Sequence, residues 1–149
     1  MIKLALSDMA HRIGDADGRD TDEKAFLHRQ FRNLQNHGLL QPVGHAGYGR
    51  TSAALFDEIG VAKARIFAVL MDLGFDVKLL REANEALTAS YLGKGPAGIH
   101  RAGNIGAAID GILAGEDWTF HLSLIRNAQT GERRIVGYCK PDAEPEDSK

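Results

Sequence analysis

The chain has 149 residues, with 18 lysines and arginines against 20 acidic residues and a formal net charge of -2. This length fits one domain, or one small domain with an appendage, and a hydrophobic fraction of 44% excludes disorder throughout. Because the charges nearly balance, a nucleic-acid-binding surface would have to arise from where the cations lie. A single cysteine, Cys139, excludes an internal disulfide framework.

The N-terminal stretch is too short and too quickly polar for a secretory signal, and no apolar run approaches the roughly 18 residues of a membrane span. We therefore expect a cytoplasmic protein. In the first segment, Leu6, Met9 and Ile13 share one face of a short helix that begins near Ser7 and ends at Gly14. The acidic stretch from Asp15 to Asp20 is predicted to be a surface loop, longer than the turn usual in a helix-turn-helix.

A second helix is predicted from Asp22 to His37, with Thr21 as its N-cap. Gly38 follows as the residue that ends it, and Pro42 prevents its continuation. Its apolar face consists of Phe26, Leu27, Phe31 and Leu34.

The charge on this helix and on the glycine-rich loop after it is one-sided. No acidic residue occurs between Glu23 and Asp57, whereas several cations do. An amphipathic helix with long donor side chains, followed by a flexible basic loop, suits entry into the DNA major groove together with phosphate contacts. The cations and the histidines that add partial charge are Lys24, Arg29, Arg32, Arg50, His28, His37 and His45.

Ser52 is the predicted N-cap of a third helix that starts with Ala53 and ends near Leu73 and Gly74. A fourth helix is expected from Val77 to Leu92, with Asp76 as its N-cap. Residues 93–98 contain three glycines and a proline, which predicts a linker.

A short helix from Ile105 to Leu113 follows, closed by Gly115. Alternation of apolar and polar residues from Trp118 to Leu124 predicts a strand, residues 127–132 a hairpin loop, and residues 133–139 the returning strand. Residues 141–149 form an acidic tail that we expect to be disordered. The fold class is therefore α+β, mainly helical, with residues 99–140 as a separate helix-plus-hairpin module.

Three motifs in order resemble the DNA-binding domain of MerR-type transcription regulators. They are the run from Arg29 to Pro42 with its Gly-Leu-Leu ending, the Gly47–Ser52 run, and the Leu73-Gly74-Phe75 turn. The resemblance covers about residues 5–87 and implies a winged helix-turn-helix over residues 1–92. It implies a recognition helix, a wing at residues 44–50, and a transcription regulator that binds double-stranded DNA sequence-specifically and contacts RNA polymerase.

The chain departs from the family pattern at Gln35, at Gly49 in place of the wing arginine, and at Gly93, where members of the family continue into a dimerising coiled coil. The family's dimerisation and effector sensing are therefore not carried over. Arg29 and Arg32 are expected to contact guanine or phosphate, and Tyr48 and Arg50 to brace the backbone. The full predicted DNA-binding set is Lys24, His28, Arg29, Arg32, Asn33, Asn36, Tyr48 and Arg50.

The apolar residues of the C-terminal module cannot remain in water, and a helix with a two-stranded hairpin is marginal alone. They either cover the winged-helix core or form a homodimer interface. We favour the homodimer, because a DNA operator with two-fold symmetry is bound by a protein dimer with the same symmetry. The residues concerned are Ile105, Ile109, Ile112, Trp118 and Phe120.

No catalytic residue, metal site or cofactor site is predicted. The six histidines show no metal-ligand spacing, and His121 with Cys139 lacks an orienting acid. The Gly93-Lys94-Gly95 run does not have the spacing of a phosphate-binding loop. Two other function classes remain: an interaction module that uses the winged helix as a scaffold to bind a protein or ligand, and an excisionase-like DNA-architecture factor.

Overall fold

The computed structural model describes residues 2–49, 52–89 and 103–142. It confirms the α+β class, with helices followed by a β-hairpin, and divides the chain into two compact units, Met1–Val77 and Lys78–Lys149. Within the described ranges, no helix is both long and apolar enough to cross a bilayer.

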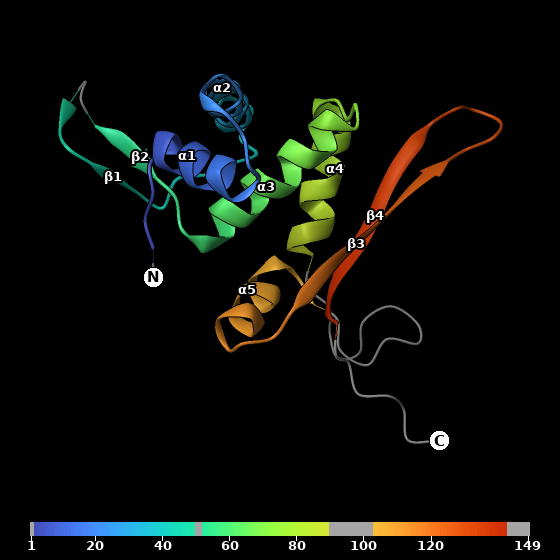
Figure 1. Ribbon diagram of the computed structural model, residues 1–149. Helices are drawn as coiled ribbons and strands as arrows, with labels where there is room; N and C mark the ends of the chain where they lie inside the picture. The colour runs from blue at the N-terminus through green and yellow to red at the C-terminus, as the bar shows by residue number, and fades with distance from the viewer. Residues whose placement is uncertain (1, 50–51, 90–102, 143–149) are drawn as a thin grey trace. The chain divides into compact units, whose positions relative to one another are not determined.

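The first unit has three helices and one small hairpin (Figure 1). Its core is fully buried and draws on every helix and on the segment before α3. The elements are α1 Leu6–Ala16, α2 Thr21–Asn36, β1 Gly44–Ala46, β2 Ala53–Leu55 and α3 Glu58–Asp72. The largest side chains in the core are Met9, Leu27, Phe31, Leu34, Leu40, Phe56 and Phe67.

The prediction that α1 ends at Gly14 is wrong, because the helix continues to Ala16. Gly14 is buried, and a Cβ at this position would collide with the side chain of Lys24. The glycine therefore permits close packing of α2 on α1 and does not end the helix. Only residues 17–20 separate the two helices, so the connection has the length usual in a helix-turn-helix.

The N-cap of α2 is Asp20, and the prediction of Thr21 is wrong by one residue. The Asp20 carboxylate accepts a hydrogen bond from the Glu23 amide at 2.8 Å, and the Glu23 carboxylate accepts one from the Asp20 amide at 3.3 Å. This reciprocal pair is a capping box. The helix ends as predicted, with His37 as C-cap and Gly38 at φ +74°.

Ser52 does not cap a helix, which corrects another prediction. Residues 53–55 form β2, which pairs antiparallel with β1 in the register His45↔Ala54. The α3 helix begins at Glu58, where the Asp57 carboxylate accepts a hydrogen bond from the Gly60 amide at 3.1 Å. An antiparallel bridge between Leu4 and Phe56 continues the extended backbone beyond β2. Pairing with other segments of the chain therefore overrides the helical propensity of Ala53 and Ala54.

The second unit contains most of α4 Val77–Thr88, then α5 Ile105–Leu113, β3 Trp118–Arg126 and β4 Arg133–Pro141. The α4 helix ends at Thr88 and not at Leu92 as predicted. The predicted linker, residues 93–98, and most of the predicted tail lie outside the described residues. The Asn104 side chain caps α5 by accepting from the Ala107 amide at 3.0 Å.

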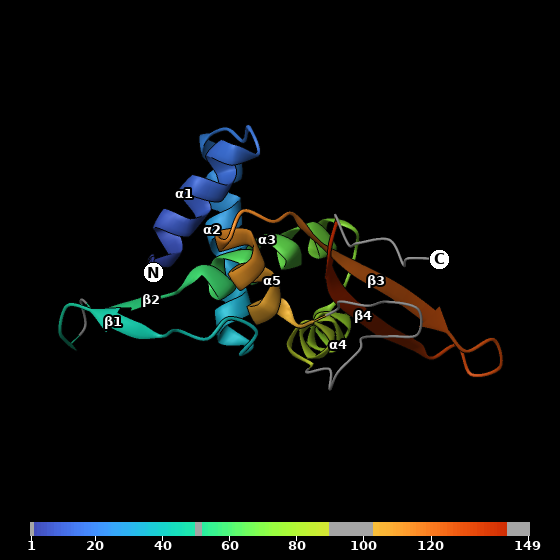
Figure 2. The ribbon, with the colours of Figure 1, turned by 90° about the horizontal axis from the view of Figure 1, so that it is seen from below.

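Strands β3 and β4 form the predicted hairpin, which both ribbon views show as a long two-stranded ribbon (Figures 1 and 2). The register runs from Trp118↔Pro141 to Arg126↔Arg133. One face carries Phe120 opposite Cys139, and the α5 helix packs at this end of the ribbon. The other face carries His121, whose ring stacks on that of Tyr138 at a centroid distance of 5.0 Å.

Candidate nucleic-acid interface

The first unit brings α2, the start of α1 and the β1–β2 hairpin around one polar hollow of about 420 Å³. Figure 2 shows the hairpin extending away from the helices at the N-terminal end of α1. Six polar residues line this polar hollow: Ser7, His28, Arg32, Gln35, His45 and Ser52. Among its described lining residues none is acidic, so the polar hollow is suited to an anionic ligand.

Two features make the polar hollow electropositive. The Arg32 guanidinium belongs to its lining, and arginine keeps its charge at any physiological pH. Leu6 and Ser7, the first residues of α1, also line it, and α1 has no side-chain cap among the described residues. Uncapped amides at a helix N-terminus carry partial positive charge, which adds to that of Arg32.

His28 lies on the same side of α2 and is half-buried. Burial, and secondarily the charge of Arg32, lower the pKa of His28 below its ordinary value of 6.5. The free protein therefore holds a neutral imidazole here near pH 7, which can donate one hydrogen bond and accept another through its two nitrogens.

Arg29 is exposed on α2, and its guanidinium carbon lies 5.8 Å from the centre of the Phe26 ring. At about 100° per residue, Arg29 lies about 60° around the helix from Arg32. The two arginines therefore share the outward face of α2, while only Arg32 lines the polar hollow. Asn33 and Asn36 are exposed on the outward side of the helix and do not line it.

The loop between β1 and β2 carries Tyr48, which is 92% exposed. Gly47 and Gly49 both have positive φ, at +85° and +59°, and this backbone presents the side chain between them to solvent. Arg50 lies outside the described residues.

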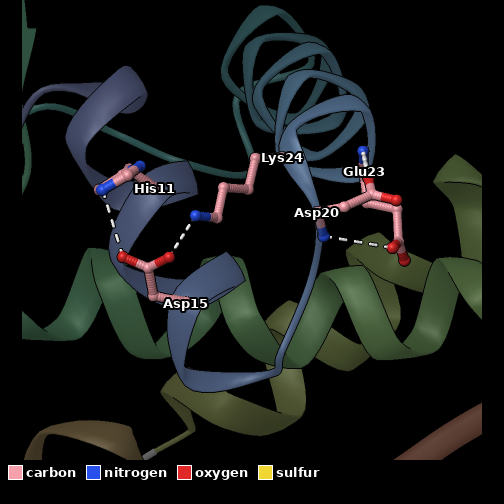
Figure 3. A network of polar contacts seen from close by, with 5 residues as sticks. All are labelled: His11, Asp15, Asp20, Glu23 and Lys24. Atoms are coloured by element: carbon pink, nitrogen blue, oxygen red, sulfur yellow. Dashed lines mark hydrogen bonds and ion pairs between the residues drawn. The ribbon is translucent and has the colours of Figure 1, made fainter.

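Lys24 differs from the rest of the predicted set because it faces α1. Its ammonium pairs with the Asp15 carboxylate, whose other oxygen lies 3.2 Å from His11 Nε2, as Figure 3 shows. The hydrogen bond from Lys24 is the main reason that the pKa of Asp15 lies below its ordinary value. This lysine holds the two helices together, so we leave it out of the candidate interface.

A larger hollow of about 730 Å³ lies at the other end of α2, near the α1–α2 turn. Its arginines are already paired: Arg65 with Asp17 at 2.6 Å and Arg19 with Asp72 at 3.4 Å. Asp22 and Glu23 also line it, so acidic groups outnumber arginines there. Despite its size, this larger hollow would repel phosphate.

The predicted dimerisation residues are divided by the structure. Ile105 is 5% exposed, while Ile109, Trp118 and Phe120 are half-buried. Ile112 is exposed, as is its neighbour Leu113. Only the last two offer an accessible apolar surface on α5.

His121 and Cys139 lie on opposite faces of the β3–β4 ribbon. His121 is paired with Tyr138, so Cys139 projects from the opposite face of the ribbon. The thiol is buried, and burial raises its pKa to about 11. In the described ranges, no group of three histidine, cysteine or acidic side chains is placed to hold a metal ion.

Sequence reasoning missed Ser7 and Ser52 as parts of the interface. Ser52 was assigned to a helix cap, and a strand assignment for residues 53–55 would have placed it beside β1. Ser7 precedes Met9 by two residues and lies on the outward side of the first turn of α1. No known protein-family model, curated protein or solved structure matches the chain.

Proposed function

We propose that the chain is a sequence-specific transcription regulator that binds double-stranded DNA. The observation that carries the proposal is the convergence of Arg32, His45 and the uncapped start of α1 on one acid-free hollow. Phosphate oxygens would occupy this polar hollow, since arginine and helix N-terminal amides both donate to them.

In this proposal α2 is the recognition helix. Arg29 and Arg32 point outward from a helix whose opposite side is fully buried, so an entire face is available to the major groove. Arginine discriminates guanine through bidentate donation to O6 and N7. Asn33 and Asn36 are exposed on the same helix and suit adenine, while Tyr48 at the hairpin tip reaches the sugar-phosphate backbone.

The helix, four-residue turn, helix and hairpin together support the resemblance to MerR-type winged-helix domains. A homodimer is part of the proposal, because one such unit reads only one half-site. The exposed Ile112 and Leu113 on α5 offer a starting surface for it. Light scattering at micromolar concentration should give twice the monomer mass, and a monomer would remove the dimer from the proposal.

Fluorescence anisotropy with a labelled random-sequence duplex tests the proposal. The wild type should bind, with an affinity that falls as salt rises. The double variant Arg29→Ala/Arg32→Ala should lose binding at salt concentrations where the wild type binds. Lys78→Ala/Arg81→Ala, which changes two exposed cations of α4, is the matched control and should bind like wild type. Absence of wild-type binding at low salt would contradict the proposal.

An interaction module is the rival, and the larger hollow favours it because Phe26 and Val69 are exposed there. The variant Val69→Ser separates the two functions. If α2 reads DNA, Val69→Ser should bind DNA like wild type. If the larger hollow binds a protein or ligand instead, Val69→Ser should weaken binding of that partner, whereas Arg32→Ala should leave it unchanged.

A further inference from the structure

The far end of the β3–β4 ribbon carries three arginines close together. Arg126 and Arg133 are directly paired across the two strands and share one face of the ribbon, while Arg134, the next residue on β4, projects from the other face. Cβ atoms of directly opposite residues are only about 4.5–5.5 Å apart, and like charges at that separation destabilise a ribbon. We call this group of three the arginine end.

No ion pair in the described part of the chain neutralises the arginine end. Glu132 is the one acidic residue between Trp118 and Pro141, against Arg126, Arg133, Arg134 and Lys140. The hairpin thus carries a concentrated positive charge although the whole chain has a net charge of -2. The repulsion between Arg126 and Arg133 is relieved when an external anion binds between their guanidinium groups.

The acidic residues that follow β4 are attached at the other end of the ribbon, where Pro141 pairs with Trp118. They are Asp142, Glu144, Glu146 and Asp147, which follow Pro141 by one to six residues, or at most about 20 Å of extended chain. Pro141 and Arg133 are eight residues apart on one strand, which corresponds to about 27 Å. A second copy meeting this end about a two-fold axis would bring arginine to arginine, so a polyanion of another kind fits better.

We propose that the arginine end binds the sugar-phosphate backbone of duplex DNA, as a contact separate from α2. The proposal rests on the proposed DNA-binding function and extends it to the second unit. The guanidinium fork matches phosphate oxygens, and a two-stranded ribbon is narrow enough to enter a DNA groove. The contact is independent of sequence and strengthens binding at whatever site α2 selects.

The salt dependence of binding measures this contact. In anisotropy titrations of the full chain with random-sequence duplex, Arg126→Gln/Arg133→Gln should flatten the slope of log K against log salt by about 2, at about 0.9 for each phosphate that is no longer neutralised. The control Lys78→Gln/Arg81→Gln removes the same charge from exposed positions of α4 and should leave the slope unchanged. A thermal melt should show the ribbon variant folded, with a melting temperature no lower than that of wild type, because like-charge repulsion is removed.

Each outcome has a separate meaning. If the wild type binds, Arg29→Ala/Arg32→Ala abolishes binding, and the ribbon variant keeps the wild-type slope, the arginine end does not touch DNA while the proposed function stands. If the ribbon variant and the α4 control flatten the slope equally, the slope reports only the net charge of the protein. The proposed contact of the arginine end with DNA would then be overturned. If the wild type binds no duplex at all, the proposed function fails and this inference fails with it.

The same variants test two other possible partners of the arginine end, an anionic lipid surface and a second copy of the chain. Co-sedimentation with vesicles of phosphatidylserine and phosphatidylcholine tests an anionic lipid surface, since Ile125 and Val136 are exposed near the arginines. Abolished vesicle binding in Arg126→Gln/Arg133→Gln with unchanged DNA binding would overturn the proposal. The proposal would also be overturned if that variant changed from dimer to monomer while the salt dependence of its DNA binding stayed the same.

Discussion

Asp20 and Glu23 hydrogen-bond each other's backbone amides and so fix the start of α2. Because α2 carries Arg29 and Arg32, the cap sets the register of the face that we propose reads DNA. Asp20→Ala should lower the free energy of unfolding by about 1 kcal/mol, the usual cost of removing an N-cap. Thr21→Ala, the position that the sequence favoured, should change it by much less.

Urea denaturation followed by circular dichroism measures both variants. A fall in midpoint with an unchanged slope would report a loss of stability alone. Equal losses for Asp20→Ala and Thr21→Ala, or a larger loss for Thr21→Ala, would contradict the cap that the structure shows.

DNA affinity should rise as pH falls from about 7.5 to about 6. The pKa of His28 lies below 6.5 in the free protein, chiefly through burial and secondarily through Arg32. Nearby phosphates would favour the charged imidazole, so binding takes up a proton and strengthens with acidity. His28→Gln should remove much of this dependence, while His45→Gln, at the hairpin side of the polar hollow, shows how much another histidine contributes.

The lowered pKa of His28 makes the free protein less stable as pH falls, whereas DNA affinity is expected to rise. A histidine whose folded pKa is lowered contributes stability that is present above its unfolded value of about 6.5 and is lost as pH falls through that range. Affinity should therefore increase under conditions in which the free fold weakens. A pH-independent affinity in the wild type would show that His28 does not face phosphate.

Cys139 should be unreactive in the folded protein. It is the only cysteine in the chain, it is buried, and burial raises its pKa to about 11. At about pH 8 almost no thiolate forms, so a disulfide reagent should react slowly with native protein and quickly after denaturation. Fast reaction under native conditions would show that the face of β3–β4 that carries Cys139 opens readily.

Helices and strands whose apolar residues recur at a regular spacing were predictable from the sequence, whereas the residues at which they begin and end were less predictable. The apolar spacing indicated α2 and α5, because one face of each helix is buried, and the Trp118–Leu124 alternation indicated β3, in which Trp118, Phe120 and Leu122 are half-buried. Gly14 was misjudged because its role depends on Lys24 of another helix. Ala53 and Ala54 were misjudged because pairing with β1, which lies across a loop, decides their conformation.

The site was predictable in part for the same reason. Helical spacing places Arg29 and Arg32 on an outward face, which follows from the buried positions between them. Spacing along the chain does not indicate that Ser7 of α1 and His45 of β1 approach Arg32, since tertiary packing alone brings them together. Likewise, the pairing of Arg126 with Arg133 depends on the register set by the Asn127–Glu132 turn.

The central claim is that duplex DNA lies against α2 and the β1–β2 hairpin. A titration of isotope-labelled protein with duplex, followed by amide chemical shifts, tests it residue by residue. We expect the largest shifts at His28, Arg32, His45 and Ser52, with little change at Asp72 in the larger hollow. Shifts concentrated around the larger hollow, or none at all with excess duplex at low salt, would contradict it.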